Sequence, residues 1–151
     1  MQVTVDTLGA QIMSIRSADG LEYLWQGDSR YWAERSPLLF PLIGRLYGQR
    51  YTYAEKEYTL PIHGFASKME FEAAQRTPEA ITFSLESNEE TLKCYPFPFI
   101  LSVTFLLEGS TLRVCHRVCN TGTETMYFGL GGHPGMYTST GRNSSMPLTT
   151  W

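Results

Sequence analysis

The feature that most constrains this chain is a long alternation of apolar and polar residues in its second half. It covers residues 99–107, stops at the turn sequence Glu108-Gly109-Ser110, and resumes over residues 111–118. A period of two places successive side chains on opposite faces of a β-strand, and a short turn between two such runs joins them as an antiparallel hairpin. On the second strand this pattern puts His116 on the apolar face, which predicts a packed, hydrogen-bonded core histidine.

Shorter patterns of the same kind fill most of the remaining chain. They predict three further hairpins, at residues 12–17 with 22–25, 50–53 with 57–60, and 71–75 with 80–85. Helical periodicity is almost absent, and only residues 29–32 and 88–91 suit a short helix or turn. Many short strands separated by turns in a chain of 151 residues predict one all-β domain, an antiparallel β-sandwich or barrel.

Charge and composition exclude several classes of partner. The net charge is −3 and the basic residues are scattered, so the sequence predicts no nucleic-acid partner. No apolar run is long enough to cross a bilayer, and the first residues lack the basic start and apolar core of a secretory signal, so no membrane association and a cytoplasmic location are predicted. Of the three cysteines, Cys115 and Cys119 would lie roughly 13 Å apart in a strand, too far for a disulfide. We therefore expect free thiols.

Three segments do not fit a plain sandwich. Residues 35–45 place two prolines in an apolar run that ends in Gly44-Arg45, while His63 and His133 each lie among glycine and proline. Such loops take unusual backbone paths and often carry the chemistry of a rigid sheet. Histidine is the side chain best suited to proton transfer near neutral pH, and a half-buried arginine needs a carboxylate or a ligand oxygen. From the residues alone, both histidines could equally be hydrogen-bonded structural groups, and Arg45 could equally form an internal ion pair.

Several motifs in succession resemble the aldose 1-epimerase (galactose mutarotase-like) family, in particular its LacX-like bacterial branch. The order and spacing match over roughly residues 8 to 136. The motifs are Glu22-Tyr23-Leu24-Trp25-Gln26-Gly27, Pro37-Leu38-Leu39-Phe40-Pro41-Leu42-Ile43-Gly44-Arg45, Leu60-Pro61-Ile62-His63-Gly64-Phe65-Ala66, Ser87-Asn88-Glu89-Glu90-Thr91 and Gly131-Gly132-His133-Pro134. The resemblance implies an antiparallel β-sandwich of the galactose mutarotase-like supersandwich type, incomplete at the C-terminus. We expect residues 1–151 to form a single partial domain, with 1–136 family-like and 137–151 a divergent tail.

The resemblance also implies a reaction, the interconversion of the α and β anomers of a hexose. By analogy His133 is the general acid, His63 binds and polarises the sugar oxygens, and Arg45 binds a sugar hydroxyl. The family needs no metal or organic cofactor, and the sequence contains no cofactor motif. Where many relatives have arginine, Ser67-Lys68 follows Gly64-Phe65-Ala66, which argues against a contact to a sugar phosphate there.

The family's catalytic base is a glutamate far downstream, in a portion that this chain lacks. We therefore expect the chain alone to be weakly active or inactive. Two alternatives stay open, namely a non-catalytic carbohydrate-binding remnant and a truncated product whose exposed sheet edge pairs with a second chain.

Overall fold

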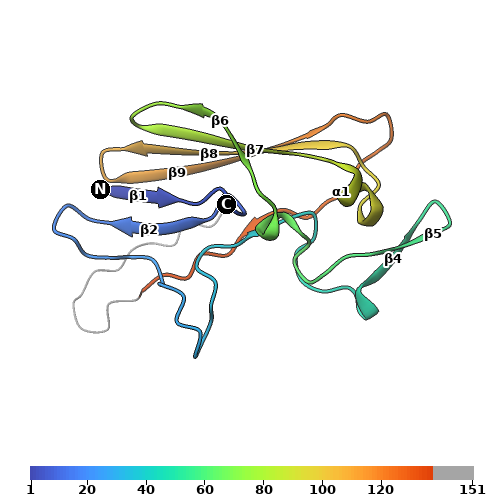
Figure 1. Ribbon diagram of the computed structural model, residues 1–151, viewed down its shortest axis with the longest axis horizontal. Coiled ribbons are helices and arrows are strands. Elements are labelled where there is room, and N and C mark those ends of the chain that lie inside the picture. The colour runs from blue at the N-terminus through green and yellow to red at the C-terminus, as the bar shows by residue number, and fades with distance from the viewer. Residues whose placement is uncertain (138–151) are drawn as a thin grey trace.

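The computed structural model describes residues 1–137, in which strands are the main regular structure beside one short α-helix and two 3-10 turns (Figure 1). Residues 138–151, which include nearly all of the predicted divergent tail, lie outside the described residues. The elements, in chain order, are β1 (Gln2–Val5), β2 (Ile12–Arg16), β3 (Leu38–Leu39), the 3-10 turn η1 (Tyr47–Gln49), β4 (Arg50–Tyr53), β5 (Lys56–Thr59), the 3-10 turn η2 (Ala66–Lys68), β6 (Glu72–Arg76), β7 (Ala80–Glu86), α1 (Glu89–Cys94), β8 (Phe99–Glu108), β9 (Thr111–Asn120) and β10 (Gly131–Gly132).

The largest sheet has the strand order β6-β7-β8-β9, with every neighbouring pair antiparallel. The predicted hairpin of residues 99–107 and 111–118 is confirmed as β8 and β9, which pair from Phe99↔Asn120 to Glu108↔Thr111. Alternate β8 side chains, from Phe99 to Phe105, are buried, and they belong to the main hydrophobic core. The prediction of an all-β antiparallel sandwich is confirmed.

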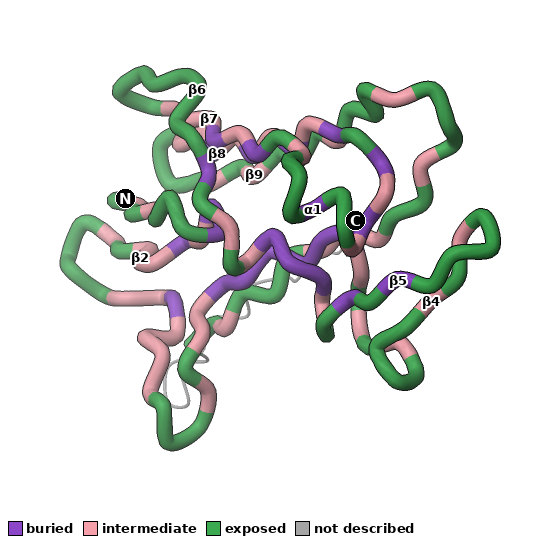
Figure 2. The backbone as a smooth tube through the Cα atoms, turned by 45° about the vertical axis from the view of Figure 1, so that its right-hand side comes forward, coloured by how far each residue is buried: buried purple, intermediate pink, exposed green. Residues whose placement is uncertain are grey.

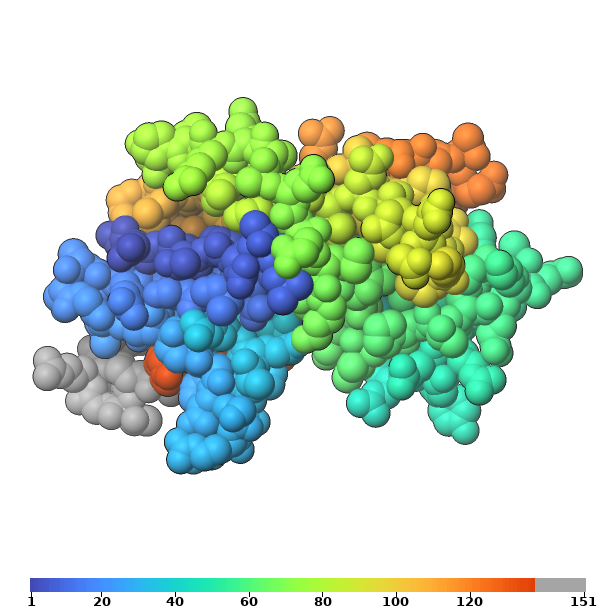
Figure 3. All heavy atoms as spheres, viewed as in Figure 1, coloured from blue at the N-terminus to red at the C-terminus, as the bar shows by residue number. Residues whose placement is uncertain are grey.

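Three two-stranded sheets, β1-β2, β3-β10 and β4-β5, complete the architecture. Figure 1 shows β1 and β2 beneath the large sheet and the β4–β5 hairpin at the opposite end of the molecule, where the space-filling view shows it projecting from the body (Figure 3). The predicted hairpins at residues 50–60 and 71–85 are confirmed. The prediction that residues 22–25 form the partner strand of residues 12–17 is confirmed only in part. The strand that pairs with β2 is β1, whereas residues 21–23 lie antiparallel along β2 through the bridge Arg16↔Glu22 and the backbone hydrogen bonds from Tyr23 to Ile15 and from Ser17 to Leu21, without forming a strand.

The core gathers where the leucines and aromatics of residues 38–66 meet the large sheet, visible as the continuous purple path through the middle of Figure 2. Phe40 lies at its centre, with no exposed surface and with edge-on or tilted contacts to Phe65, Tyr95, Phe99 and Phe128. Aromatic pairs of this kind contribute beyond the area that they bury. The core therefore holds the loop that carries His63 firmly against the sheet.

The short helix predicted near residues 88–91 is α1, which a reciprocal cap begins: the Asn88 side chain accepts from the backbone of Thr91, and the Thr91 hydroxyl accepts from the Asn88 backbone. At residues 29–32 the chain forms a turn, in which the amides of Tyr31 and Trp32 both donate to the Asp28 carbonyl. Within residues 1–137 there is no helix of the length and apolarity that crossing a membrane requires.

Candidate active site

The loop that carries His63 is held by an unusually close backbone contact. Gly64 forms a parallel bridge with Phe40, and a Cβ atom on Gly64 would lie only 2.2 Å from the Phe40 carbonyl oxygen. That same oxygen accepts hydrogen bonds from the amides of Phe65 and Ala66. Gly64 has φ of +75°, a conformation that glycine adopts without cost. The sequence His63-Gly64 therefore specifies where the loop meets the core.

His63 is joined to Gly44 by two hydrogen bonds that close a ring. The His63 amide donates to the Gly44 carbonyl at 2.9 Å, and the Gly44 amide donates to Nδ1 of the His63 imidazole at 3.0 Å. His63 itself has φ of +64°, an uncommon conformation for a residue with a side chain. The side chain is half-buried, and its position is set by backbone groups alone.

His133 follows the two-residue strand β10, whose glycines pair with Leu38 and Leu39 of β3. Its amide donates to the Pro37 carbonyl at 3.1 Å, so the backbone on both sides of the residue is anchored to the segment that precedes Phe40. The imidazole is exposed and meets the Trp32 ring edge to face, with 5.1 Å between ring centroids. Trp32 therefore forms one wall beside the predicted general acid.

These anchors bring together two histidines that are 70 positions apart in the sequence (133 minus 63). Their ring centroids lie 6.4 Å apart with an interplanar angle of 40°. One oxygen atom at a hydrogen-bonding distance of about 2.8 Å from a nitrogen of each ring fits such a separation. The two imidazoles can therefore both reach the same hydroxyl or ring oxygen.

Arg45 follows Gly44 directly and has an exposed side chain. None of the ion pairs or side-chain hydrogen bonds between residues 1 and 137 involves it, so the alternative of an internal ion pair finds no partner there. By contrast Lys68, which follows Ser67 at the point where many relatives have an arginine, forms an ion pair with Glu34 at 2.6 Å. The charge of Arg45 is left to face solvent or a ligand.

Three further expectations concern groups outside this pair. His116 faces the same side as the buried Val103 of β8, as predicted, but it is exposed, so its assignment to the packed core is wrong. Within the described residues β9 is the last strand of its sheet; its Leu112, Val114 and Val118 pack against the core only partly buried, and the fully buried side chains end at β8. The cysteines Cys94, Cys115 and Cys119 are free. Among residues 1–137, no three His, Cys, Asp or Glu side chains gather as a metal site requires.

The site is open rather than enclosed. A cavity of about 480 Å³ between β1 and the large sheet, and an aromatic groove of about 400 Å³ beside the β4–β5 hairpin, contain none of the three predicted residues. No carboxylate in residues 1–137 forms an ion pair or hydrogen bond with either imidazole. The described residues thus offer two imidazoles and a free guanidinium, without a carboxylate bonded to them.

Two contributors to the site, Gly44 and Trp32, are not among the site residues predicted from the sequence. In the sequence Gly44 is noticed only because it precedes Arg45. Its amide contributes to the site by donating a hydrogen bond to the imidazole of His63, 19 positions later in the chain. Trp32 is held because Trp25 donates from its indole nitrogen to the Trp32 carbonyl at 2.7 Å and because Gly135 lies against both rings. The glycine of His133-Pro134-Gly135 was the available signal, since close packing on a ring excludes a side chain there.

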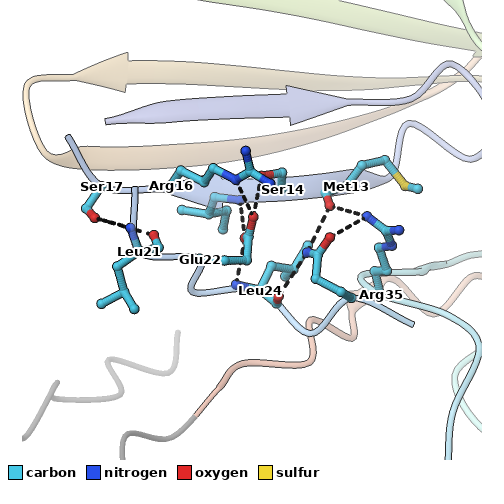
Figure 4. A network of polar contacts seen from close by, with 10 residues as sticks. Met13, Ser14, Arg16, Ser17, Leu21, Glu22, Leu24 and Arg35 are labelled. Atoms are coloured by element: carbon cyan, nitrogen blue, oxygen red, sulfur yellow. Dashed lines mark hydrogen bonds and ion pairs between the residues drawn. The ribbon is translucent and has the colours of Figure 1, made fainter. Parts of the chain in front are cut away.

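Glu22 was also missed, although it begins the first recognised motif. Burial acts to raise the pKa of its carboxyl, but hydrogen bonds from the Ser14 hydroxyl, the amides of Ile15 and Leu24, and the Arg16 side chain outweigh that effect and lower the pKa to about 2. Figure 4 shows this carboxylate tying β2 to the segment that leads to Trp25. Through Leu24 it helps to position the neighbouring Trp25, whose indole nitrogen donates to the Trp32 carbonyl.

A family model described as aldose 1-epimerase matches residues 1–146. The plasmid-encoded protein LacX of Lactococcus lactis subsp. lactis is 40% identical over 140 residues, which make up 89% of this chain and 47% of that protein. The chromosomal LacX protein of the same organism is 39% identical over the same length.

Solved structures agree with this match. The galactose mutarotase related enzyme from Lactobacillus acidophilus is 44% identical, with a TM-score of 0.89 over 93% of this chain and 48% of that one. A galactose mutarotase-like protein from Lactobacillus casei is 36% identical, with a TM-score of 0.86 over 89% of this chain and 46% of that one. The chain therefore spans about half the length of the relatives that it matches.

Proposed function

Since this chain belongs to the aldose 1-epimerase family, we propose that His133, His63 and Arg45 form the proton-donating and sugar-binding side of a site for hexose mutarotation. The observation that carries the proposal is the 6.4 Å separation of the two imidazoles, which lets both reach one oxygen of a pyranose. Neither the residue types nor their order along the chain requires that proximity.

Each residue has a role in the proposed reaction. His133 gives a proton to the ring oxygen while a base takes the proton of the anomeric hydroxyl, so that the bond between C1 and the ring oxygen breaks and an open-chain aldehyde forms. Rotation about the bond between C1 and C2 and the reverse transfers then give the other anomer. His63 holds a sugar oxygen, and Arg45 donates to a hydroxyl through its planar guanidinium. Trp32 offers an apolar ring beside His133 against which a pyranose can lie.

The base of this reaction is assigned, by family analogy, to a glutamate downstream of the matched half. A second candidate function follows from the same geometry: the chain binds a hexose without converting it, because no carboxylate is bonded to the histidine pair within residues 1–137. In both cases the ligand is a neutral sugar and the binding groups are the same.

Exchange spectroscopy by NMR on α- and β-galactose and glucose tests the proposal. Anomer exchange above the buffer rate that falls with His133→Gln supports catalysis, whereas chemical-shift changes on sugar addition without exchange support the binding function. His116→Gln is the matched control, because it removes an exposed histidine from β9 and should change neither result. If the sugars neither bind nor exchange, both functions are refuted.

A further inference from the structure

The hydrogen-bonded ring between His63 and Gly44 defines more than the position of the imidazole. We propose that the Gly44 amide is a positioning group that fixes the tautomer of the His63 imidazole, with the proton on Nε2, so that His63 meets the sugar as a hydrogen-bond donor and not as a proton acceptor. This inference rests on the proposed function for the identity of the ligand. The position of the proton on the imidazole is argued independently of the proposed function.

The tautomer follows from the partners. A neutral imidazole has one N–H donor and one acceptor nitrogen, and a backbone N–H can only donate. Because the Gly44 amide donates to Nδ1 at 3.0 Å, Nδ1 supplies a lone pair and the proton lies on Nε2. Moving the proton to Nδ1 would set two N–H groups against each other and leave the Gly44 amide without its acceptor.

The surrounding backbone keeps the ring in this arrangement. The His63 amide donates to the Gly44 carbonyl, so the two residues are held at both their backbone and side-chain groups. On the other side Gly64 is packed against the Phe40 carbonyl, at a distance that leaves no room for a Cβ atom. The unusual φ of +64° at His63 is thus maintained by contacts before and after it.

The two histidines consequently have different roles. Within residues 1–137 the His63 imidazole accepts at Nδ1 from Gly44, whereas no hydrogen bond is formed by the His133 imidazole. His63 can donate from Nε2 to a sugar oxygen and thereby polarise it, and the transfer of a proton to the ring oxygen is left to His133. A symmetric pair in which either imidazole takes the proton is inconsistent with the Gly44 contact.

Nitrogen-15 NMR of the imidazole side chains tests the assignment on the unmodified chain. At neutral to alkaline pH, His63 should show an unprotonated Nδ1 and a protonated Nε2. His63→Gln identifies the signals by their loss, and His116 and His133 serve as internal references. A protonated Nδ1, or a mixture of tautomers, overturns the inference whatever the sugar-binding result. The Nε2–H tautomer together with no sugar binding upholds this assignment and refutes the proposed function.

A pair of variants separates the two nitrogens. In His63→Asn the amide oxygen can replace Nδ1 as acceptor for Gly44 but no donor remains at the Nε2 position, whereas in His63→Gln the amide nitrogen can replace the Nε2 donor. Galactose binding should weaken about 3- to 10-fold in the Asn variant, as for the loss of one neutral hydrogen bond, and by less than about threefold in the Gln variant.

Stability should follow the opposite order, because asparagine tolerates a positive φ better than glutamine does. Opposite orders for binding and for melting temperature show that binding loss is not a folding defect. If the Asn variant binds galactose as tightly as the unmodified chain and the Gln variant does not, the donor role of Nε2 is disproved.

Discussion

Replacing Gly64 by alanine should be among the most damaging single-methyl additions in this protein. The new Cβ would lie 2.2 Å from the Phe40 carbonyl oxygen and 2.5 Å from its carbonyl carbon, and both are backbone atoms of a fully buried residue. The left-handed conformation of Gly64 costs a residue with a side chain about 1–2 kcal/mol. Moving the Phe40 carbonyl weakens the hydrogen bonds that it accepts from the amides of Phe65 and Ala66, each contributing about 0.5–1.5 kcal/mol. We expect a total loss of about 2–5 kcal/mol.

Gly109→Ala is the matched control for this change. Gly109 also has a positive φ, +61°, but a Cβ atom there would meet nothing within 4 Å. This variant should therefore lose only the conformational part, about 1–2 kcal/mol. Urea unfolding followed by tryptophan fluorescence measures both free energies of unfolding. Equal losses in the two variants would show that the contact with Phe40 is not what holds the His63 loop, and the account of the site would be wrong.

Three further changes follow from other contacts. Lowering the pH should remove stability that Glu22 contributes: its folded-state pKa of about 2 lies below the ordinary value of 4.5, so the contribution is complete above about pH 4.5 and is lost as the pH falls toward 2. Because solvent screens this partly exposed carboxylate, we expect its contribution to the free energy of unfolding to be about 1–2 kcal/mol. In Glu22→Gln the free energy of unfolding should therefore fall less steeply between about pH 4.5 and 2, and an unchanged slope would show that the network in Figure 4 does not stabilise the chain. Replacing Ala54-Glu55, which both have positive φ in the β4–β5 turn, by Asn-Gly should stabilise the chain by about 1 kcal/mol in thermal melts; a lower melting temperature would contradict the turn assignment. Gly135→Ala places a Cβ 2.9 Å from both the Trp25 Cβ and the Trp32 ring, so it should shift the His133 NMR signals while Gly20→Ala, in open space, leaves them unchanged.

The sheet was predictable because its pattern is local. Phe99, Leu101, Val103 and Phe105 alternate with more polar residues, and the period alone identifies both the strand and its buried face. The turns of the hairpins β6–β7 and β8–β9 likewise contain proline or glycine, which suit reversal of the chain, whereas the β4–β5 turn is formed by Ala54-Glu55. At β2 the pattern identified only one of two neighbours: residues 21–23 do lie along one edge, but the strand that pairs with β2 is β1, which was not predicted. On the other edge of β2 the Glu22 carboxylate accepts from the amides of Ile15 and Leu24, so a side chain makes part of the contact that a regular strand ladder would make.

For the site, the sequence by itself determined which residues to consider. Glycine and proline around His63 and His133 mark backbone paths that few other sequences can take, and the order of the motifs identifies the family. The sequence could not predict the 6.4 Å separation of the two imidazoles. That separation results from two separate attachments to the segment around Phe40, one through Gly64 and one through β10. The sequence could not predict the burial of His116 either. Its side chain lies on the predicted face of β9, but its exposure depends on which elements pack over that strand.

Only the tertiary structure decided the state of His63. A neutral histidine can carry its proton on either of two distinct ring nitrogens, and the residues next to His63 in the sequence do not show which one is used. The distinction comes from one amide, that of Gly44, 19 positions earlier in the chain. Local pattern therefore supplies the strands and the candidate groups, while contacts between distant segments set their separation, exposure and protonation, because those properties belong to pairs of residues and not to single positions.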